Sequence, residues 1–339
     1  MTAVAEQETA PERRRVRAVP SRGMSTVLIA LLALAVLGYL TAPSSMKQGA
    51  LLSMLPFAAV LAIAALGQTL VVMQGGIDLS VAGTMSLVVV IITHEAYGDN
   101  GKVLPAALLA LAAAVAAGLL NGLLIGRFGL NAIVATLGTN ALLYAGVLGV
   151  SGGTPRETTD LMARLAGNST LGVPNAVWFA LVAVALVTVV VKRTAAGRRF
   201  EAVGANPFAA FTTGLRIQRF QAGAYVWATV MYWLAGALLA GIINKPTAYE
   251  GDSYVLASVA AVVLGGTSLL GGRGNLVASA LAALFLTQLQ QYVLALGVTF
   301  AVQTLVQAAA LTIGVALYTV NWSRLRTRLS GRAPRPAPA

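Results

Sequence analysis

The sequence offers few side chains that could carry out covalent or metal chemistry. It has no cysteine, and its single histidine, His94, is followed by one glutamate, Glu95. Two such ligands make a poor metal site, and the sequence contains neither an HExxH helix motif nor a GxxxxGK[ST] phosphate-binding loop. We therefore expect no catalytic residue, no metal and no cofactor on this chain, which cannot hydrolyse ATP by that route.

Polar chemistry appears instead in QGGIDLSVAG, Gln74 to Gly83, within an otherwise apolar stretch. Gly75 and Gly76 permit backbone angles that other residues resist, so they predict an interrupted helix. Asp78 and Ser80 are good N-caps for the helix that follows, because their oxygens can accept hydrogen bonds from its free amides. The Asp78 carboxylate could be such a cap, a hydrogen-bond acceptor for a passing polyol, or a proton-coupling group.

The amino-acid composition indicates the kind of secondary structure in which these residues lie. Hydrophobic residues make up 58% of the 339, charged residues only 10%, and the mean hydropathy is +0.80, whereas soluble domains carry about 25% charged residues. Apolar runs near the roughly 20 residues that span a bilayer recur along the chain, without the alternating pattern typical of a barrel. The predicted fold class is an all-α polytopic membrane protein.

About ten apolar runs are expected to form helices, and the third and eighth are too short to cross a bilayer comfortably alone. A helix break at membrane depth is tolerated only against protein or a watery cavity, so QGGIDLS is expected on the translocation side of the bundle. The predicted spans are Met24–Leu40, Ala50–Met73, Leu79–Thr93, Val103–Ile125, Ala132–Val150, Pro174–Val191, Phe220–Ile243, Tyr254–Leu264, Asn275–Tyr292 and Phe300–Val320.

Basic residues mark one side of the membrane. If the N-terminus is cytoplasmic, eighteen of the 23 lysines and arginines fall on that side, mainly in clusters at 13–22, 192–199 and 324–335. The positive-inside rule then places both termini in the cytoplasm. The clusters could also bind anionic lipid headgroups, whereas nucleic-acid binding is not supported. We expect disordered basic tails at 1–23 and 323–339 around a transmembrane domain at 24–322.

Neutral polar side chains populate the predicted spans. Amides and hydroxyls suit a path for an uncharged hydroxylated solute, although each could equally make an interhelical hydrogen bond. A second break, GGTSLLGGRG at 265–274, is either a simple loop or a gate between two half-helices. The candidate path and break residues are Gln68, Gly75, Gly76, Asp78, Ser80, Asn121, Thr136, Thr139, Asn140, Gly265, Gly266 and Thr267, and the ninth span adds the amides of Gln288, Gln290 and Gln291.

The polar loop at 192–219 lies on the basic side and is too short to form a domain of its own. Its centre contains good helix formers, and Asn206-Pro207 is a helix start with proline in the first turn. Phe208 and Phe211 are three residues apart and so share one helix face. A short amphipathic helix of this kind either docks into a groove of a partner or lies as an anchor in the headgroups.

Four motifs, in this order, resemble one known family. GGIDLSVAG, LNAIVATLGT, EAVGANPFAAFTTGL and AVVLGGTSLLGGRG are similar to the GGIDLSVG, PxFIATLGT, AxGxNxxAAxxxG and VLGGTSLxGGxG signatures of ribose-type ABC importer permease subunits. These permeases belong to a superfamily that handles branched-chain amino acids and sugars. The similarity covers residues 51–320.

This resemblance implies a cobalamin-uptake-like permease fold in the bacterial inner membrane. It further implies a second permease subunit, as a homodimer or heterodimer, a cytoplasmic ATPase that holds ATP and Mg, and an external solute-binding protein. The expected function is translocation of a small neutral solute, with a monosaccharide as the first candidate, by alternating access. The segment that the resemblance assigns to ATPase coupling contains Glu201, Ala202, Gly204, Asn206, Pro207, Phe208, Ala209, Ala210 and Gly214.

The sequence departs from the family pattern at three positions. Phe208 stands where glutamate is common and Phe211 where a polar residue is frequent. Both changes give the loop a more apolar docking surface, which suggests a dedicated partner. Asn131 replaces the usual proline before the IVATLGT helix, and this predicts a looser or differently phased N-cap.

Other interpretations stay open. A stand-alone secondary transporter or channel would depend on a buried ionisable group such as Asp78 and would need no ATPase. Within the same architecture, an amino acid, a nucleoside or a furanosyl signal could replace the sugar. The loops Ser151–Val173 and Asn244–Ser253 mix charges of both signs, and they either dock the external binding protein or are ordinary solvated loops.

Overall fold

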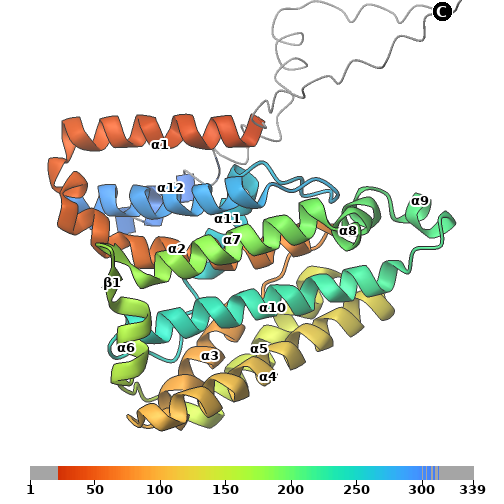
Figure 1. The fold of residues 1–339 in the computed structure, drawn as a ribbon, viewed down its shortest axis with the longest axis horizontal. Helices are drawn as coiled ribbons and strands as arrows, with labels where there is room; N and C mark the ends of the chain where they lie inside the picture. The colour runs from red at the N-terminus through yellow and green to blue at the C-terminus, as the bar shows by residue number, and fades with distance from the viewer. Residues whose placement is uncertain (1–21, 300, 303, 307, 310–311, 313–339) are drawn as a thin grey trace, which may run out of the picture.

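The computed structural model describes residues 22–299, 301–302, 304–306, 308–309 and 312 (Figure 1). The predicted tails lie outside these residues, except that 22 and 23 begin the first helix. The helices are α1 Arg22–Thr41, α2 Gln48–Met73, α3 Val81–Ala96, α4 Val103–Gly122, α5 Ala132–Ser151, α6 Asp160–Gly167, α7 Asn175–Arg193, α8 Ala195–Ala205, α9 Pro207–Thr212, α10 Ile217–Ile242, α11 Tyr254–Leu264 and α12 Leu276–Ala295. Two short strands, β1 Ser169–Thr170 and β2 Val173–Pro174, pair antiparallel.

The helices agree with most of the predicted spans. In the described part of the chain, seven helices are long and apolar enough to cross a membrane. The two predicted as too short are α3, with 16 residues, and α11, with 11 residues. Most of the tenth predicted span lies outside the described residues, although those described between 301 and 312 are helical. The all-α polytopic fold is confirmed, while the number of spans and their orientation stay predictions.

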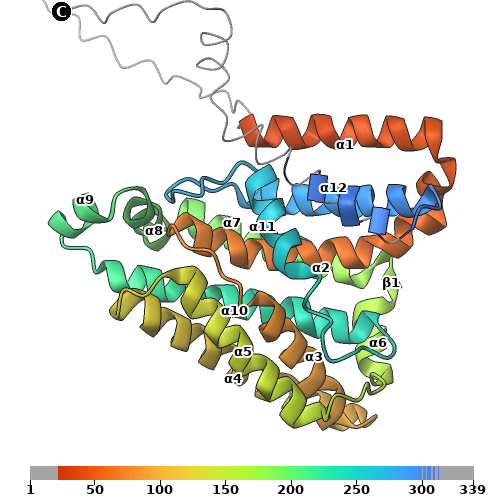
Figure 2. The ribbon, with the colours of Figure 1, turned by 180° about the vertical axis from the view of Figure 1, so that it is seen from behind.

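Helices α2 and α10 lie side by side at the centre of the bundle (Figure 1). Helix α10 also packs against α3 and α4, whereas α2 also packs against α7, α11 and α12. The reverse view shows α1 along α12 at one edge and α4 with α5 at the other (Figure 2). Helices α8 and α9 lie at one end of the bundle, which we call the α8 end, and α6 lies at the opposite end, which we call the α6 end.

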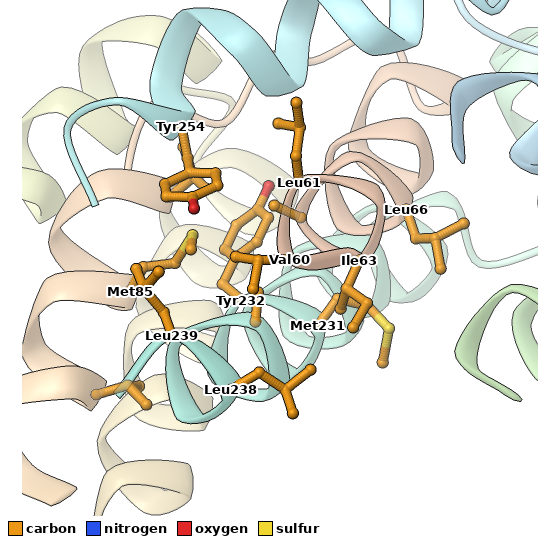
Figure 3. Close-up of a cluster of buried hydrophobic side chains, with 14 of the residues drawn as sticks. Val60, Leu61, Ile63, Leu66, Met85, Met231, Tyr232, Leu238, Leu239 and Tyr254 are labelled. Carbon is orange, nitrogen blue, oxygen red and sulfur yellow. The ribbon is translucent and has the colours of Figure 1, made fainter. Parts of the chain in front are cut away.

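The core follows the contact between α2 and α10. Every residue of α2 from Ala58 to Met73 is buried, as expected for a helix that is apolar all round. Gly67 permits the close approach of the two helices, because a Cβ there would lie 2.7 Å from the Tyr232 ring and 2.8 Å from the Ala228 carbonyl oxygen. Figure 3 shows the side chains of this cluster, including Val60, Leu61, Ile63, Leu66, Met85, Met231, Tyr232, Leu238, Leu239 and Tyr254.

The start of α5 corrects one prediction. Asn131 was expected to give a looser or differently phased N-cap than proline. Its Oδ1 atom instead accepts hydrogen bonds from the amides of Ile133 (2.9 Å) and Val134 (3.4 Å). Asparagine is among the best N-cap residues because its side chain satisfies amides that have no partner within the helix, so α5 begins with a well-formed cap.

Candidate functional site

The first break begins with a glycine-dependent ending of α2. The amide of Gly75 bonds to the carbonyl of Val72 (2.9 Å), and the amide of Gly76 bonds to that of Val71 (3.2 Å). Gly75 has a φ of +79°, a conformation that side chains disfavour. This pair of bonds is the Schellman motif, which stops a helix while satisfying its last carbonyls. The predicted interruption is therefore present, directly after Met73.

The second break begins in the same way. At the end of α11, the amide of Gly266 bonds to Val263 (2.9 Å) and that of Thr267 bonds to Val262 (3.2 Å). Gly266 has a φ of +80° and takes the place that Gly75 has in the first break. The two interrupted helices of the bundle therefore end with one shared backbone geometry.

The turn before α3 is closed by Asp78. Its Oδ1 atom accepts hydrogen bonds from the Ser80 amide (2.9 Å) and the Ser80 hydroxyl (2.6 Å). Ser80 occupies the N-cap position of α3, but its side chain bonds to no amide of that helix. The prediction that these two side chains cap the first amides of α3 is therefore wrong. The carboxylate stabilises the turn, while its buried Oδ2 atom has no hydrogen-bond partner among the described residues.

Helix α5 supplies the contacts that α3 does not obtain from its own cap. Thr136 Oγ1 accepts a hydrogen bond from the Leu79 amide (3.0 Å), and Asn140 Oδ1 accepts one from the Gly83 amide (2.7 Å). Leu79 lies just before α3, and Gly83 lies in the first turn of α3, where amides have no partner within the helix. The two bonds therefore fasten the start of α3 to α5.

A chain of side-chain hydrogen bonds ties α4 and α5 to the same turn. Thr139 Oγ1 donates to Asn121 Oδ1 (2.6 Å), and Asn121 Nδ2 donates to Ser80 Oγ (2.9 Å). Ser80 in turn donates to Asp78. A buried network of this kind favours one arrangement, since breaking any of these links leaves a further buried polar group without a partner.

Gln68 fastens the other side of the turn to α2 and α10. In the orientation that satisfies its whole amide, its oxygen accepts from the Asp78 amide (3.1 Å), and its nitrogen donates to the Asp78 carbonyl (3.0 Å) and the Tyr232 hydroxyl (2.9 Å). Gly76 leaves room for the second tyrosine of α10, because a Cβ there would lie 2.3 Å from the Tyr225 hydroxyl.

The structure thus brings most of the sequence-predicted path residues together as a packed network. Gln68, Asp78, Ser80, Asn121 and Thr136 are fully buried. They hold the first break in place and do not line the polar cavity described below. Direct contact between these groups and a passing solute stays a prediction.

The loop from Gly265 to Asn275 forms the second break. The Ser268 amide bonds to the Arg273 carbonyl (3.1 Å), and Thr267 Oγ1 accepts from the Asn275 amide (3.3 Å). Asn275 then caps α12 by accepting from the Ala278 amide (3.1 Å). The segment is an ordered loop between α11 and α12, and its use as a gate stays a prediction.

The loop at 192–219 folds into two helices that meet at Asn206, where the sequence indicated a single short helix. Asn206 ends α8 and caps α9, since its Oδ1 atom accepts from the Ala209 amide (3.0 Å) and Pro207 occupies the first turn. Glu201 belongs to α8 and pairs with Lys192 at the end of α7. We call α8 and α9 together the coupling segment.

The outer surface of α9 carries two exposed aromatic side chains. The side chain of Phe208 is 87% exposed and that of Phe211 is 71% exposed, both on α9. Helix α9 then ends with Gly214, at a φ of +81°, whose amide bonds to the Phe211 carbonyl (2.9 Å). Two uncovered aromatic rings on a short helix fit both uses predicted from the sequence, docking into a partner and anchoring in the headgroups, and both stay predictions.

The coupling segment touches both breaks at one place. The Met73 carbonyl accepts a hydrogen bond from the Gly272 amide (2.8 Å). A Cβ on Gly204 would lie 2.0 Å from the same carbonyl oxygen, and one on Gly271 would lie 2.7 Å from the Gly204 carbonyl oxygen. We call Met73, Gly204, Gly271 and Gly272 the glycine junction.

A side-chain contact reinforces the junction. Gln74, at the end of α2, donates from Nε2 to the Phe200 carbonyl of α8 (2.9 Å). At the glycine junction, backbone therefore lies directly on backbone, with no flexible side chain between α8, the end of α2 and the second break. The geometry therefore joins an exposed segment to both interrupted helices.

A polar cavity of about 430 Å³ opens toward the α6 end, between α2, α11, α12 and the end of α10. Its size lies within the range of about 300–1,000 Å³ that small-molecule sites occupy. Phe57 and Tyr254 contribute aromatic surface. The polar groups in its wall are Ser53, Glu250, Ser253, Thr287, Gln290 and Gln291.

Two amides in this cavity are available to a ligand. Gln290 and Gln291 make no side-chain hydrogen bond to any residue that the structure describes. Glu250 is held in place, since its Oε1 atom accepts from the amide and the hydroxyl of Thr247 (both 2.8 Å). An amide offers two donors and an acceptor, which suits a ligand rich in hydroxyl groups.

Sequence reasoning found part of this cavity. The glutamines of α12 were noted as polar groups in an apolar span, whereas Ser53 and Phe57 were not considered as site residues, and Glu250 was considered only as part of a loop that could dock the binding protein. Ser53 and Phe57 lie in the first part of α2, and Glu250 lies in the loop before α11, where a polar or aromatic residue is unremarkable by itself. Only the packing of α2 beside α12 places them around one space.

The loops at the α6 end are ordered by contacts of their own. The Tyr144 hydroxyl donates to Asp252, and the Tyr144 ring lies 5.4 Å from that of Tyr249. Partial burial raises the pKa of the Asp252 carboxyl above its ordinary value. The Arg156 guanidinium lies 4.1 Å from the centre of the Tyr97 ring. Docking of a binding protein on these loops stays a prediction.

An all-helical membrane bundle with two interrupted helices, both fastened to an exposed helix pair, is the architecture of a transport permease. Comparison with known proteins agrees. Residues 50–316 match the family model described as "Branched-chain amino acid transport system / permease component".

Several individual proteins are similar over most of their length. A probable ABC transporter permease protein, y4mJ of Sinorhizobium fredii, is 35% identical over 284 residues, which is 83% of this chain and 85% of that protein. The ribose import permease protein RbsC of Escherichia coli K12 is 32% identical over 294 residues, 85% and 91% of the two chains. The autoinducer 2 import system permease protein LsrC of Salmonella paratyphi B is 35% identical over 234 residues, 68% and 67%. No solved structure matches the chain.

The chain belongs to this family of ABC transporter permease subunits. Such subunits are transport components and not catalysts. The protein is therefore a multi-pass protein of the inner membrane and forms part of a solute importer.

Proposed function

We propose that this chain forms half of the membrane channel of an ATP-driven importer whose cargo is a monosaccharide or a similar neutral polyol. A second permease subunit completes the channel. A cytoplasmic ATPase binds ATP and Mg, and an external binding protein delivers the solute. This chain itself binds no cofactor.

The polar cavity near the α6 end carries the assignment of the cargo. Its free amides, Gln290 and Gln291, match a hydroxylated solute, and the aromatic Phe57 offers a face for the apolar side of a sugar ring. Weak neutral contacts of this kind permit release of the cargo. The names of the relatives, for ribose and autoinducer 2 import, support the same class of solute.

The glycine junction supports the mechanism. ATP binding and hydrolysis on the partner would move the coupling segment, held by Phe208 and Phe211 in the groove of the ATPase. Gly204 would pass this movement to Met73 and to Gly272, so that α2 and α12 change their angles together. The cavity would then close toward the α6 end and open toward the α8 end, which is alternating access.

The test is reconstitution of the chain with its ATPase in nanodiscs, with and without the binding protein. The expected result is stimulation of ATP hydrolysis by binding protein loaded with one sugar, among ribose, other pentoses and hexoses. Transport that persists after the ATPase is removed would overturn the proposal and favour a secondary transporter. Stimulation only by a loaded amino acid or nucleoside would keep the architecture and overturn the sugar assignment.

A further inference from the structure

A second cavity is lined mainly by apolar residues, and the proposed transport mechanism does not involve it. An apolar groove of about 290 Å³ lies near the α8 end, between α7, α8 and α10. Its wall includes Leu186 and Val190 of α7, Phe200 of α8, and Phe220 and Trp227 of α10. It lies away from the polar cavity, which has none of these residues in its wall.

The groove opens on the side of the bundle that faces hydrocarbon. Leu186 is 55% exposed and Trp227 is 58% exposed, and the apolar residues of α7 that flank the groove point outward in the same way. Apolar side chains on the surface of a spanning helix contact lipid tails, so an acyl chain can enter the groove without crossing a polar barrier.

A cation stands at the mouth of the groove. Arg219, in the first turn of α10, lines it. Among the described residues, the guanidinium of Arg219 has no ion-pair partner, while the nearby carboxylate of Glu201 is paired with Lys192. Arg193 and Arg216 add positive charge at the same end. A free guanidinium beside an apolar groove complements one phosphate attached to a long hydrocarbon chain.

We propose that this groove, lined by Leu186, Val190, Phe200, Gly223, Trp227 and Arg219, binds an anionic glycerophospholipid. One acyl chain lies along α7 and α10, and the headgroup phosphate binds the Arg219 guanidinium. Because Phe200 belongs to α8 and its carbonyl accepts the hydrogen bond from Gln74, the lipid contacts the coupling segment directly. The site requires only a membrane-embedded chain, so it does not depend on the identity of the cargo.

A substitution at Gly223 can test whether the groove binds lipid. It lines the groove, and a Cβ built on it meets no atom within 4 Å. Leucine is a better helix former than glycine, and its Cβ meets no neighbour here, so Gly223→Leu extends into the groove without weakening the helix propensity of α10. Gly49→Leu is the matched control, because Gly49 is also helical with open space around it but lies at the start of α2, at the α6 end.

The role of the Arg219 charge can be tested with a matched pair of variants. Arg219→Gln removes the cation of the groove, whereas Arg127→Gln removes an exposed arginine that follows α4. Both variants lower the net charge by the same amount. A loss of binding confined to Arg219→Gln therefore reports a site and not the general attraction of a basic surface.

The experiment is native mass spectrometry of the delipidated full chain, titrated with phosphatidylglycerol or phosphatidylcholine. We expect phosphatidylglycerol to bind more tightly than phosphatidylcholine, Arg219→Gln to weaken phosphatidylglycerol about fivefold, and Gly223→Leu to weaken both lipids. Gly49→Leu and Arg127→Gln should bind as the unaltered chain does. Equal weakening by Arg127→Gln, no effect of Gly223→Leu, or a Gly223-dependent self-association without lipid would each overturn the proposal.

Discussion

The carbonyl oxygen of Met73 occupies the space that a side chain on Gly204 would need, since a Cβ there would lie only 2.0 Å away. The same oxygen accepts the Gly272 amide at 2.8 Å. One carbonyl at the end of α2 therefore contacts both the coupling segment and the second break.

Gly204→Ala should uncouple the protein. The added methyl group must displace backbone, so we expect a loss of stability of about 1–3 kcal/mol and a larger loss of solute-stimulated ATP hydrolysis. Gly138→Ala is the control, because a Cβ at Gly138 meets no atom within 4 Å. Thermal unfolding and ATPase assays on the reconstituted complex separate the two effects. Normal stimulation in Gly204→Ala would contradict the role of the glycine junction.

Asn206→Ala should weaken the coupling segment by removing the cap of α9. The Ala209 amide then loses its acceptor, at a cost of about 1 kcal/mol, and the angle between α8 and α9 is no longer fixed. We expect weaker binding of the ATPase in a pull-down or by interferometry. Asn206→Asp keeps the acceptor and should bind nearly as the unaltered chain does. If both variants lose binding equally, the side chain acts in some way other than capping.

Asp78→Asn distinguishes a structural carboxylate from a proton-coupling one. The amide oxygen can still accept from the Ser80 amide and hydroxyl, so transport should persist with an unchanged pH profile. Asp78→Ala removes that acceptor and leaves two buried donors unsatisfied, at about 1–3 kcal/mol each, so it should lower the thermal stability. Abolished transport in a well-folded Asp78→Asn protein would favour proton coupling.

Gln290→Ala and Gln291→Ala should weaken recognition of the solute without unfolding the protein. Neither amide is bonded within the described chain, so no buried partner is left unsatisfied by the change. Loss of one hydrogen bond of about 0.5–1.5 kcal/mol predicts a rise of a few-fold in the KM for transport. Gln48→Ala, an exposed glutamine at the same end of the bundle that does not line the cavity, is the control. An unchanged KM in both variants would place solute recognition elsewhere.

The features predicted correctly from sequence are those encoded locally. Gly75 permits the positive φ that ends α2, and Asn206-Pro207 favours the start of α9, so both boundaries follow from short-range backbone chemistry. Asn131 shows the limit of comparison with a family pattern. An asparagine caps as well as the usual proline starts a helix, although the pattern alone suggested a weaker start.

The features that sequence could not provide depend on packing between distant segments. Gly204 is an ordinary helical glycine until Met73 is placed beside it, 131 positions away in the numbering. Asp78 and Ser80 are good caps by type, but Ser80 makes no cap bond, and Asn140 of α5 accepts from the Gly83 amide in the first turn of α3 instead. The polar cavity likewise exists only because the start of α2 and the end of α12 share one end of the bundle.

The lengths of the two short helices, α3 and α11, bear on how the protein enters the membrane. At 1.5 Å per residue, α3 is about 24 Å long and α11 about 16 Å, both shorter than the roughly 30 Å of the hydrocarbon layer. Neither helix can be released into lipid alone, because the backbone groups and polar side chains at its break would have no partners there. Helix α3 packs against α4, α5 and α10, and helix α11 packs against α2 and α12. We therefore expect each short helix to leave the insertion machinery only together with these neighbours, which makes them part of the insertion step and not only of the finished fold.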